Sequence, residues 1–186
     1  MREDHHSTIL GGNARGSCKR KYQAFCAGFT LIELMVTIAV MGLLMMVAIP
    51  SFNEATISSK LGANANNLVA SATLARSEAI KRNAVITLCM SSTGTACATT
   101  GDWSQGWIVL MGTTVLEYQL ANSSNLKISE SSGAASLTFQ PIGVGATQSR
   151  FTVCKASPSA GSQERIVTVS ATGYASVKKQ SLGVCV

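Results

Sequence analysis

The longest hydrophobic run of the chain lies near its N-terminus. From Leu34 to Ile49 there is no charged residue, and leucine, isoleucine, valine and methionine predominate. Counted from Phe29 to Phe52, the segment is long enough for a membrane-spanning helix, which needs about 20 residues. The pattern predicts a helix that is apolar on every side.

A second helical pattern follows this run. Apolar residues recur there at spacings of three, four and seven, which places them on one helical face: Ile57, Leu61, Leu68, Ala72, Ala75 and Ala79. We expect one helix from about Phe29 to Arg82, apolar all round in its first half and amphipathic in its second. Pro50 is expected to kink or locally interrupt it. A membrane anchor followed by an independent helix is the alternative.

Beyond Asn83 the pattern changes to short β-forming runs separated by turn residues. The predicted strands are Ala84–Cys89, Trp107–Met111, Val115–Leu120, Leu126–Ser129, Leu137–Phe139, Phe151–Cys154, Arg165–Ser170 and Tyr174–Val177. The turns between them are marked by Gly112, Asn122-Ser123-Ser124, Gly133, Gly143-Val144-Gly145 and Gly173. An antiparallel β-sheet head and the second half of the helix each have an apolar face to bury, so we expect an α+β fold in which they pack together.

The distribution of charge assigns an orientation to the apolar segment. The formal net charge is +6, and half of this excess lies in residues 1–28, which hold five basic and two acidic residues. Basic residues beside an apolar helix mark its cytoplasmic side. We therefore place residues 1–28 in the cytoplasm. The remaining excess is spread over a far longer stretch and is weak support for nucleic-acid binding.

One carboxylate, Glu33, lies near the start of the apolar run. A charged side chain in a membrane segment costs about 2.5–3.5 kcal/mol on insertion scales, so it usually has a function. The alternative is that Glu33 lies at the membrane interface and extends its side chain toward water.

Two common explanations of an N-terminal apolar run fit this one poorly. A secretory signal peptide has a short apolar region and a small-residue cleavage site, whereas this run is long and the Ala48–Ser51 segment is a poor site. A lipoprotein signal ending at Cys26 is excluded because the apolar stretch follows that cysteine. In addition, the bulky Phe25 occupies a position that should be small.

The segment Gly28-Phe29-Thr30-Leu31-Ile32-Glu33 resembles the prepilin motif of type IV pilins and type II secretion pseudopilins. The resemblance implies that a prepilin peptidase cuts between Gly28 and Phe29 and methylates the new N-terminal amine. It also implies that Glu33 pairs with the N-terminal amine of a neighbouring subunit. Such a pair is favourable because opposite charges attract strongly in a low-dielectric core, whereas an unpaired charge is penalised.

With this cut the chain has four expected parts. They are a cytoplasmic leader (1–28) that is removed, a transmembrane and assembly helix (29–52), an amphipathic helix of the head (53–83) and a periplasmic β-rich head (84–186). The mature chain is expected in the inner membrane, in a single pass, and then in a pilus or pseudopilus. Its expected partners are other pilin or pseudopilin subunits and the peptidase.

The head is similar to the GspH/FimT family, which contains H-type minor pseudopilins of type II secretion and FimU/FimT-type minor pilins of type IV pili. Four elements carry the resemblance: the segments Ala75–Ala79 (ARSEA), Cys89–Cys97 (CMSSTGTAC) and Trp103–Trp107 (WSQGW), and Gly173. The resemblance implies a structural subunit that primes or caps a type IV filament. Trp103 and Trp107 are expected to anchor the core rather than form a binding pair.

Four of the six cysteines lie in the part assigned to the oxidising periplasm: Cys89, Cys97, Cys154 and Cys185. Cys18 and Cys26 lie in the leader, where thiols stay reduced. Four cysteines favour disulfides and allow three connectivities. We favour Cys89–Cys97, which closes a short loop, and Cys154–Cys185, which holds the C-terminal end to an inner strand. Two disulfides favour a pilus subunit over a secretion pseudopilin.

No catalytic or metal-binding constellation emerges from the sequence. Both histidines, His5 and His6, lie in the leader, so the mature chain lacks the base of Ser-His-Asp and Cys-His sites. Cys89 and Cys97 are too far apart for a zinc-binding pair. We therefore expect no enzyme activity, no cofactor and no metal.

A DNA-binding minor pilin for natural transformation is the alternative function. DNA-binding members of the resembled family carry a Gly-Arg-x-Arg segment near the C-terminus, whereas this chain has Gly173-Tyr174-Ala175-Ser176 and lacks both arginines. Lys178, Lys179 and Arg165 are the candidate DNA contacts. Lysine lacks the bidentate geometry of arginine, and the lysine pair is equally explained as protection of a strand edge.

Overall fold

The computed structural model describes residues 28–120, 125–155, 164–180 and 185. The leader cysteines and histidines, most of the leader itself and the turn at 122–124 lie outside these residues. The chain divides into two compact units, Met1–Leu43 and Leu44–Val186.

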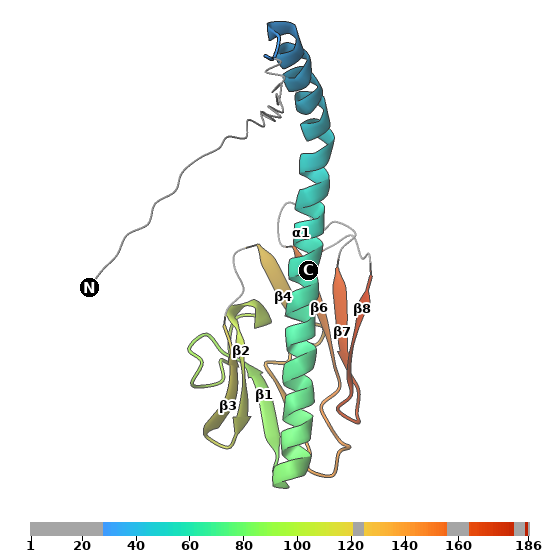
Figure 1. The fold of residues 1–186 in the computed structure, drawn as a ribbon. Coiled ribbons are helices and arrows are strands. Elements are labelled where there is room, and N and C mark those ends of the chain that lie inside the picture. Colours follow the sequence, from blue (N-terminus) through green and yellow to red (C-terminus); the bar gives the residue numbers. More distant parts are fainter. Residues whose placement is uncertain (1–27, 121–124, 156–163, 181–184, 186) are drawn as a thin grey trace, which may run out of the picture. The chain divides into compact units, whose positions relative to one another are not determined.

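Helix α1 (Leu31–Arg82) has nearly the bounds that the hydrophobic pattern predicts. It continues through Pro50 without interruption, so the local break expected there does not occur. Its last turn carries Lys81 and Arg82, and basic side chains are favourable at the carboxyl end of a helix. In Figure 1, the second half of α1 runs along the strands.

Each predicted strand is present, and its ends differ by at most two residues from those predicted. The strands are β1 (Ile86–Met90), β2 (Trp107–Met111), β3 (Thr114–Gln119), β4 (Leu126–Glu130), β5 (Ser136–Phe139), β6 (Ser149–Lys155), β7 (Arg165–Val169) and β8 (Ala175–Lys179). A short 3₁₀ helix, η1 (Trp103–Gln105), precedes β2. These strands are short runs of β-forming residues bounded by turn residues, which is a local pattern, so their positions follow from the sequence.

The strands form two four-stranded sheets, in the orders β3-β2-β1-β5 and β4-β6-β7-β8. All neighbouring strands are antiparallel; Leu88, for example, lies opposite Val109 on one side and Leu137 on the other. The expectation of a helix packed on an antiparallel β head is therefore confirmed. The pattern of β-forming runs and turn residues did not show whether the strands form one sheet or two. β5 follows β4 in the chain but joins the other sheet, beside β1.

The main core lies between α1 and the inner faces of both sheets. The stripe predicted on the helix is buried there: Leu61, Leu68, Ala72, Ala75 and Ala79 are at most 1% exposed, and Ile57 is partly buried against them. The helix residues Ala65 and Ser71 are also fully buried. Small residues along this stripe let the helix approach the strands closely, and the large side chains of the core come mostly from the strands.

Candidate functional site

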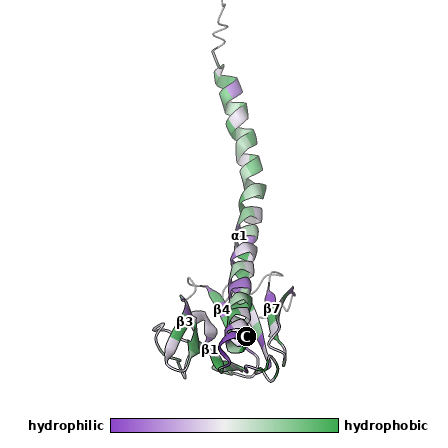
Figure 2. Ribbon diagram, turned by 60° about the horizontal axis from the view of Figure 1, so that its bottom comes forward, coloured by the Kyte–Doolittle hydropathy of each residue, from purple (hydrophilic) through white to green (hydrophobic). Residues whose placement is uncertain are grey.

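The first part of α1 is apolar and exposed. From Phe29 to Phe52 the large hydrophobic side chains, among them Leu31, Met46 and Val47, are about half to three quarters exposed. Figure 2 shows hydrophobic positions around this stretch of helix, interrupted by few polar ones. Within the described residues, α1 is the one helix whose length and composition suit a membrane span. A signal sequence can have the same length and composition. The motif at the start of α1 is therefore needed to distinguish a retained membrane helix from a signal sequence.

Glu33 lies in the first turn of α1, with Thr30 directly before the helix. The backbone N–H of Glu33 donates a hydrogen bond to Oγ1 of Thr30 at 3.2 Å, and the N–H of Leu34 donates to the carbonyl of Thr30 at 3.1 Å. Thr30 therefore caps the helix, and a threonine followed three residues later by glutamate is a recognised capping sequence. This capping role was not among the predictions above, although the spacing of Thr30 to Glu33 is visible in the sequence. Glu33 is also a stabilising charge at the positive end of the helix.

Gly28 and Phe29 precede α1, belong to no helix or strand, and are exposed. No other part of the described chain comes within 4 Å of a Cβ atom built on Gly28, and the side chain of Phe29 is 76% exposed. Both residues that flank the bond expected to be cut are thus exposed.

A disulfide joins Cys89 of β1 to Cys97, with Cα atoms 5.6 Å apart. Cys89 is buried with Ile108 and Leu110 in a second, smaller core on the face of the first sheet that points away from α1. The ring of Tyr118 on β3 lies against Gly94, where a Cβ atom would approach ring carbons to 2.8 Å. The disulfide loop therefore lies over this outer face. A side chain at position 94 would prevent the loop from approaching the ring of Tyr118 this closely, so glycine is required there.

A second disulfide joins Cys154 of β6 to Cys185. Strand β8 ends at Lys179 and is separated from β6 by β7, so this bridge returns the C-terminal end of the chain to an inner strand. Both bridges have the pairing that the sequence analysis favoured.

The two tryptophans are core anchors. Trp103 and Trp107 are at most 2% exposed, and Trp103 packs edge-to-face on Phe151 with ring centroids 4.9 Å apart. The indole N–H of Trp103 donates to the carbonyl of Ala134 at 3.0 Å, and that of Trp107 donates to Oγ of Ser71 at 3.0 Å. Both rings are therefore held in the core by packing and by a hydrogen bond.

The structure does not bring the candidate DNA contacts together on one surface. Lys179 lies opposite Arg165 on β7, and both share the strand face of Val167, which is buried toward α1. Arg165 is only partly exposed, and its guanidinium donates to Oγ of Ser58 on the helix at 3.0 Å. Lys178 points to the opposite face, because successive strand residues alternate. Strand β8 is an edge strand, which agrees with the lysine pair protecting that edge.

Glu130 is a structural carboxylate that the sequence analysis did not single out. Its two oxygens accept hydrogen bonds from the N–H and hydroxyl of Ser132, the N–H of Ala134 and the hydroxyl of Ser149, all at 2.7–2.8 Å. Burial alone would raise the pKa of Glu130, but these hydrogen bonds outweigh burial and lower the pKa to about 2. The residue links the end of β4, the following turn and β6.

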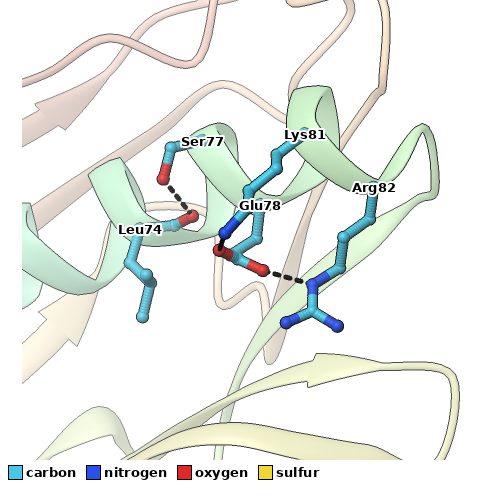
Figure 3. A network of polar contacts seen from close by, with 5 residues as sticks. All are labelled: Leu74, Ser77, Glu78, Lys81 and Arg82. Atoms are coloured by element: carbon cyan, nitrogen blue, oxygen red, sulfur yellow. Dashed lines mark hydrogen bonds and ion pairs between the residues drawn. The ribbon is translucent and has the colours of Figure 1, made fainter.

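A second carboxylate lies at the end of α1. Glu78 accepts a hydrogen bond from Nε of Arg82 and lies 3.6 Å from Nζ of Lys81, as Figure 3 shows. The hydrogen bond from Arg82 lowers the pKa of Glu78. In the described ranges no three histidine, cysteine or acidic side chains gather closely enough to hold a metal ion.

Comparison with known protein families identifies two segments. Residues 64–173 match the family described as Type II transport protein GspH, and residues 24–49 match the prokaryotic N-terminal methylation motif. The search of curated proteins found no match.

Among solved structures, the type IV minor pilin FimU of Pseudomonas aeruginosa is similar, with a TM-score of 0.53 and 22% identity over 64% of this chain and 89% of that one. The minor pseudopilin EpsH of the Vibrio cholerae type 2 secretion system also matches, with a TM-score of 0.44 and 14% identity over 64% of this chain and 97% of that one. At 22% identity the first likeness shows a shared fold. Since the GspH match covers more than half of the chain and the methylation motif precedes it, the chain belongs to the GspH family of minor pilins and pseudopilins.

Proposed function

We propose that this chain is a low-abundance structural subunit that primes or caps a type IV filament. The observation that carries the proposal is the accessible apolar start of α1 with Glu33 as its single charge, directly after Gly28 and Phe29. An exposed apolar helix is unstable in water and needs either lipid or other helices around it. The membrane and the filament interior are two such surroundings, so the same segment serves as anchor and as assembly element.

In this proposal the leader (1–28) is removed at the cytoplasmic face of the inner membrane, and Phe29 is methylated. The head, with its two disulfides, lies in the periplasm. Glu33 then pairs with the N-terminal amine of a neighbouring subunit. A carboxylate in a lipid environment without a cation is unfavourable, and docking supplies that cation, so Glu33 favours the assembled state over the membrane monomer.

Three variants separate assembly from helix capping, since Thr30 and Glu33 together form the helix start. Glutamine can replace glutamate in a capping box but carries no charge. Glu33→Gln and Glu33→Ala should both be cleaved normally and both be missing from sheared filaments. Thr30→Ala loses the cap but keeps the charge, and it should still enter filaments. Normal amounts of Glu33→Gln in filaments would overturn the charge role of Glu33.

Cleavage itself is checked by mass spectrometry of the mature chain. The expected N-terminal residue is Phe29 carrying one methyl group, and the apolar segment is retained. A product that begins after the apolar segment would overturn the proposal. Deletion of the gene distinguishes a type IV pilus subunit from a type II secretion subunit. It reduces surface pili in the first case and protein secretion in the second.

The DNA-binding alternative has no surface in the described residues that gathers its candidate contacts. It predicts that the mature chain, in detergent micelles at low salt, shifts short duplex DNA and loses this activity as salt rises. A shift that Lys178→Gln and Lys179→Gln abolish would replace the structural proposal by the DNA receptor.

A further inference from the structure

The second sheet carries basic residues at the end that lies toward the apolar part of α1 (Figure 1). Lys155 ends β6, Arg165 begins β7 and Lys179 ends β8. These strands are antiparallel neighbours, so the three strand ends meet at one end of the sheet. We call Lys155, Arg165 and Lys179 the basic end.

The three side chains of the basic end lie on the same face of the sheet. Arg165 lies opposite Val153 on β6 and opposite Lys179 on β8. Lys155 is two positions beyond Val153, and strand residues two positions apart point to the same face. Val153 is part of the main core, so this is the face that packs on α1.

Other charges near the basic end leave it positive. Lys127 and Lys178 lie at the same end of the sheet, on its other face, and add to the positive charge. Glu164 is only 1% exposed, and Glu54 on α1 is an exposed carboxylate that offsets one of the basic residues. The segments 121–124, 156–163 and 181–186, which adjoin these strands in the sequence, contain no charged side chain.

The helix sets the height of the basic end above the apolar segment. The guanidinium of Arg165 donates to Oγ of Ser58 at 3.0 Å, and Ser58 is six residues beyond Phe52, where the apolar segment ends. Six helical residues span about 9 Å. The polar layer of a bilayer extends about 5–8 Å beyond the hydrocarbon core, and the Debye length at physiological salt is about 8 Å. When the apolar segment spans a membrane, the basic end therefore lies at the outer edge of the headgroup layer.

The opposite end of the same sheet differs in charge and in height. The charged strand residues there are Arg150 and Glu130, one of each sign. Arg150 is five residues from Lys155 along β6, which is about 17 Å in a strand. This distance is about two Debye lengths, so charges at the opposite end act little on a membrane beside the basic end.

We infer that the basic end binds the headgroups of anionic phospholipids in the membrane that α1 spans. Phosphate oxygens accept hydrogen bonds from lysine and arginine, and an anionic membrane attracts basic residues that lie within a Debye length of it. Duplex DNA offers the same phosphate chemistry, but the helix itself brings the basic end to lipid. The contact holds the head of the membrane monomer against the bilayer and is lost when the subunit leaves the membrane for a filament. This inference rests on the proposed function, in which α1 is a membrane helix.

The test places the photoreactive amino acid p-benzoylphenylalanine in the mature chain. The chain is reconstituted in nanodiscs of phosphatidylcholine with phosphatidylglycerol as the minor lipid, both with the same acyl chains. Gln180 is the reporting position, because it is exposed and directly follows Lys179. Tyr174, which is 63% exposed and precedes β8 at the opposite end of the sheet, is the control outside the membrane. Val47, which is 75% exposed in the apolar segment, is the control inside it.

Mass spectrometry identifies the captured lipid. At position 180 the ratio of phosphatidylglycerol to phosphatidylcholine should exceed that of the nanodisc at least about fivefold, because one basic residue beside an anionic membrane changes affinity about fivefold. Position 47 should capture lipid in every variant, and position 174 should capture none.

Lys155→Gln combined with Lys179→Gln should lower the ratio at position 180 at least about fivefold. Arg165 is retained, because it also joins the sheet to α1. Arg150→Gln combined with Lys81→Gln is the matched control. It removes the same charge from exposed side chains away from the basic end and should leave the ratio within about twofold of the wild-type value. Formation of both disulfides and protease resistance of the head show that each variant is folded.

The inference is overturned by a ratio at position 180 equal to that of the nanodisc, or by equal lipid capture at positions 174 and 180. It is also overturned if the paired lysine variant keeps the wild-type ratio or the control pair loses it equally. Short duplex DNA added to the same samples should leave the ratio unchanged. Capture of DNA at position 180 with loss of the lipid product would assign the basic end to nucleic acid instead.

Position 47 separates this inference from the proposed function. If position 47 captures no lipid, α1 is not a membrane helix and the proposed function fails. If position 47 captures lipid and position 180 shows no enrichment of phosphatidylglycerol, the headgroup contact alone fails.

Discussion

The indole N–H of Trp107 on β2 donates a hydrogen bond to Oγ of Ser71 on α1, at 3.0 Å and with both residues fully buried. The two residues are 36 positions apart and join the helix to the first sheet. A polar pair inside an otherwise apolar contact fixes the position of the helix on the sheet, because any shift leaves both groups without a partner.

Ser71→Ala should therefore destabilise the head by about 1–3 kcal/mol, since it leaves a buried indole N–H without an acceptor. Ser77→Ala is the matched control on the same helix: Ser77 is exposed, and its hydroxyl donates only to the carbonyl of Leu74 (Figure 3). Its effect should be within about 0.5 kcal/mol of zero. Urea unfolding of the mature chain in detergent micelles, followed by circular dichroism, measures both. Equal effects of the two substitutions would contradict the role of the pair.

The low pKa of Glu130 predicts acid sensitivity. Its pKa is about 2 in the folded chain and 4.5 in the reference state, so the folded state favours the ionised carboxylate. The resulting stabilisation is complete above about pH 4.5 and is lost as the pH falls toward 2. Melting temperatures between pH 7 and pH 2 should therefore decline less steeply in Glu130→Gln, which should also be less stable at pH 7. Glu54→Gln, which changes an exposed carboxylate of α1, is the control and should show the same decline of melting temperature with pH as the wild type. The prediction is refuted if Glu130→Gln also shows the wild-type decline.

The two disulfides should contribute unequally to stability. They close loops of different length, with sequence separations of 8 and 31 residues. The loop-entropy relation predicts losses of roughly 2.6 and roughly 3.7 kcal/mol when each bridge is removed. Paired cysteine-to-serine variants, Cys89→Ser with Cys97→Ser and Cys154→Ser with Cys185→Ser, test this by denaturant unfolding. A larger loss from the shorter loop would show that packing of that loop on the outer face outweighs loop entropy.

Gly173 should tolerate a side chain less well than Gly133. Their φ angles are nearly the same, +73° and +74°, so alanine pays a similar backbone penalty at both. At Gly173 the new Cβ atom would also come within 3.2 Å of Arg76 and Phe139, whereas at Gly133 nothing lies within 4 Å. Gly173→Ala should thus lower the melting temperature further than Gly133→Ala. Equal shifts would mean that the side chains of Arg76 and Phe139 move aside at no cost in stability.

Local features of the chain were predictable from its sequence. The buried stripe from Leu61 to Ala79 follows from helical periodicity, and the strands follow from short β-forming runs between turn residues, because both patterns depend on residues a few positions apart. The helix start at Thr30 was equally visible in its spacing to Glu33. The motif around Gly28 and Phe29 is a contiguous string, so it too needed no structure.

Only the tertiary structure decided how distant segments meet. It pairs Lys179 with Arg165, assigns β5 to the first sheet, and places Gly173 against Arg76. Each of these relations joins residues whose local sequences are compatible with several partners. The choice among partners depends on the packing free energy of the whole head, to which distant residues contribute jointly, and no local pattern contains that sum.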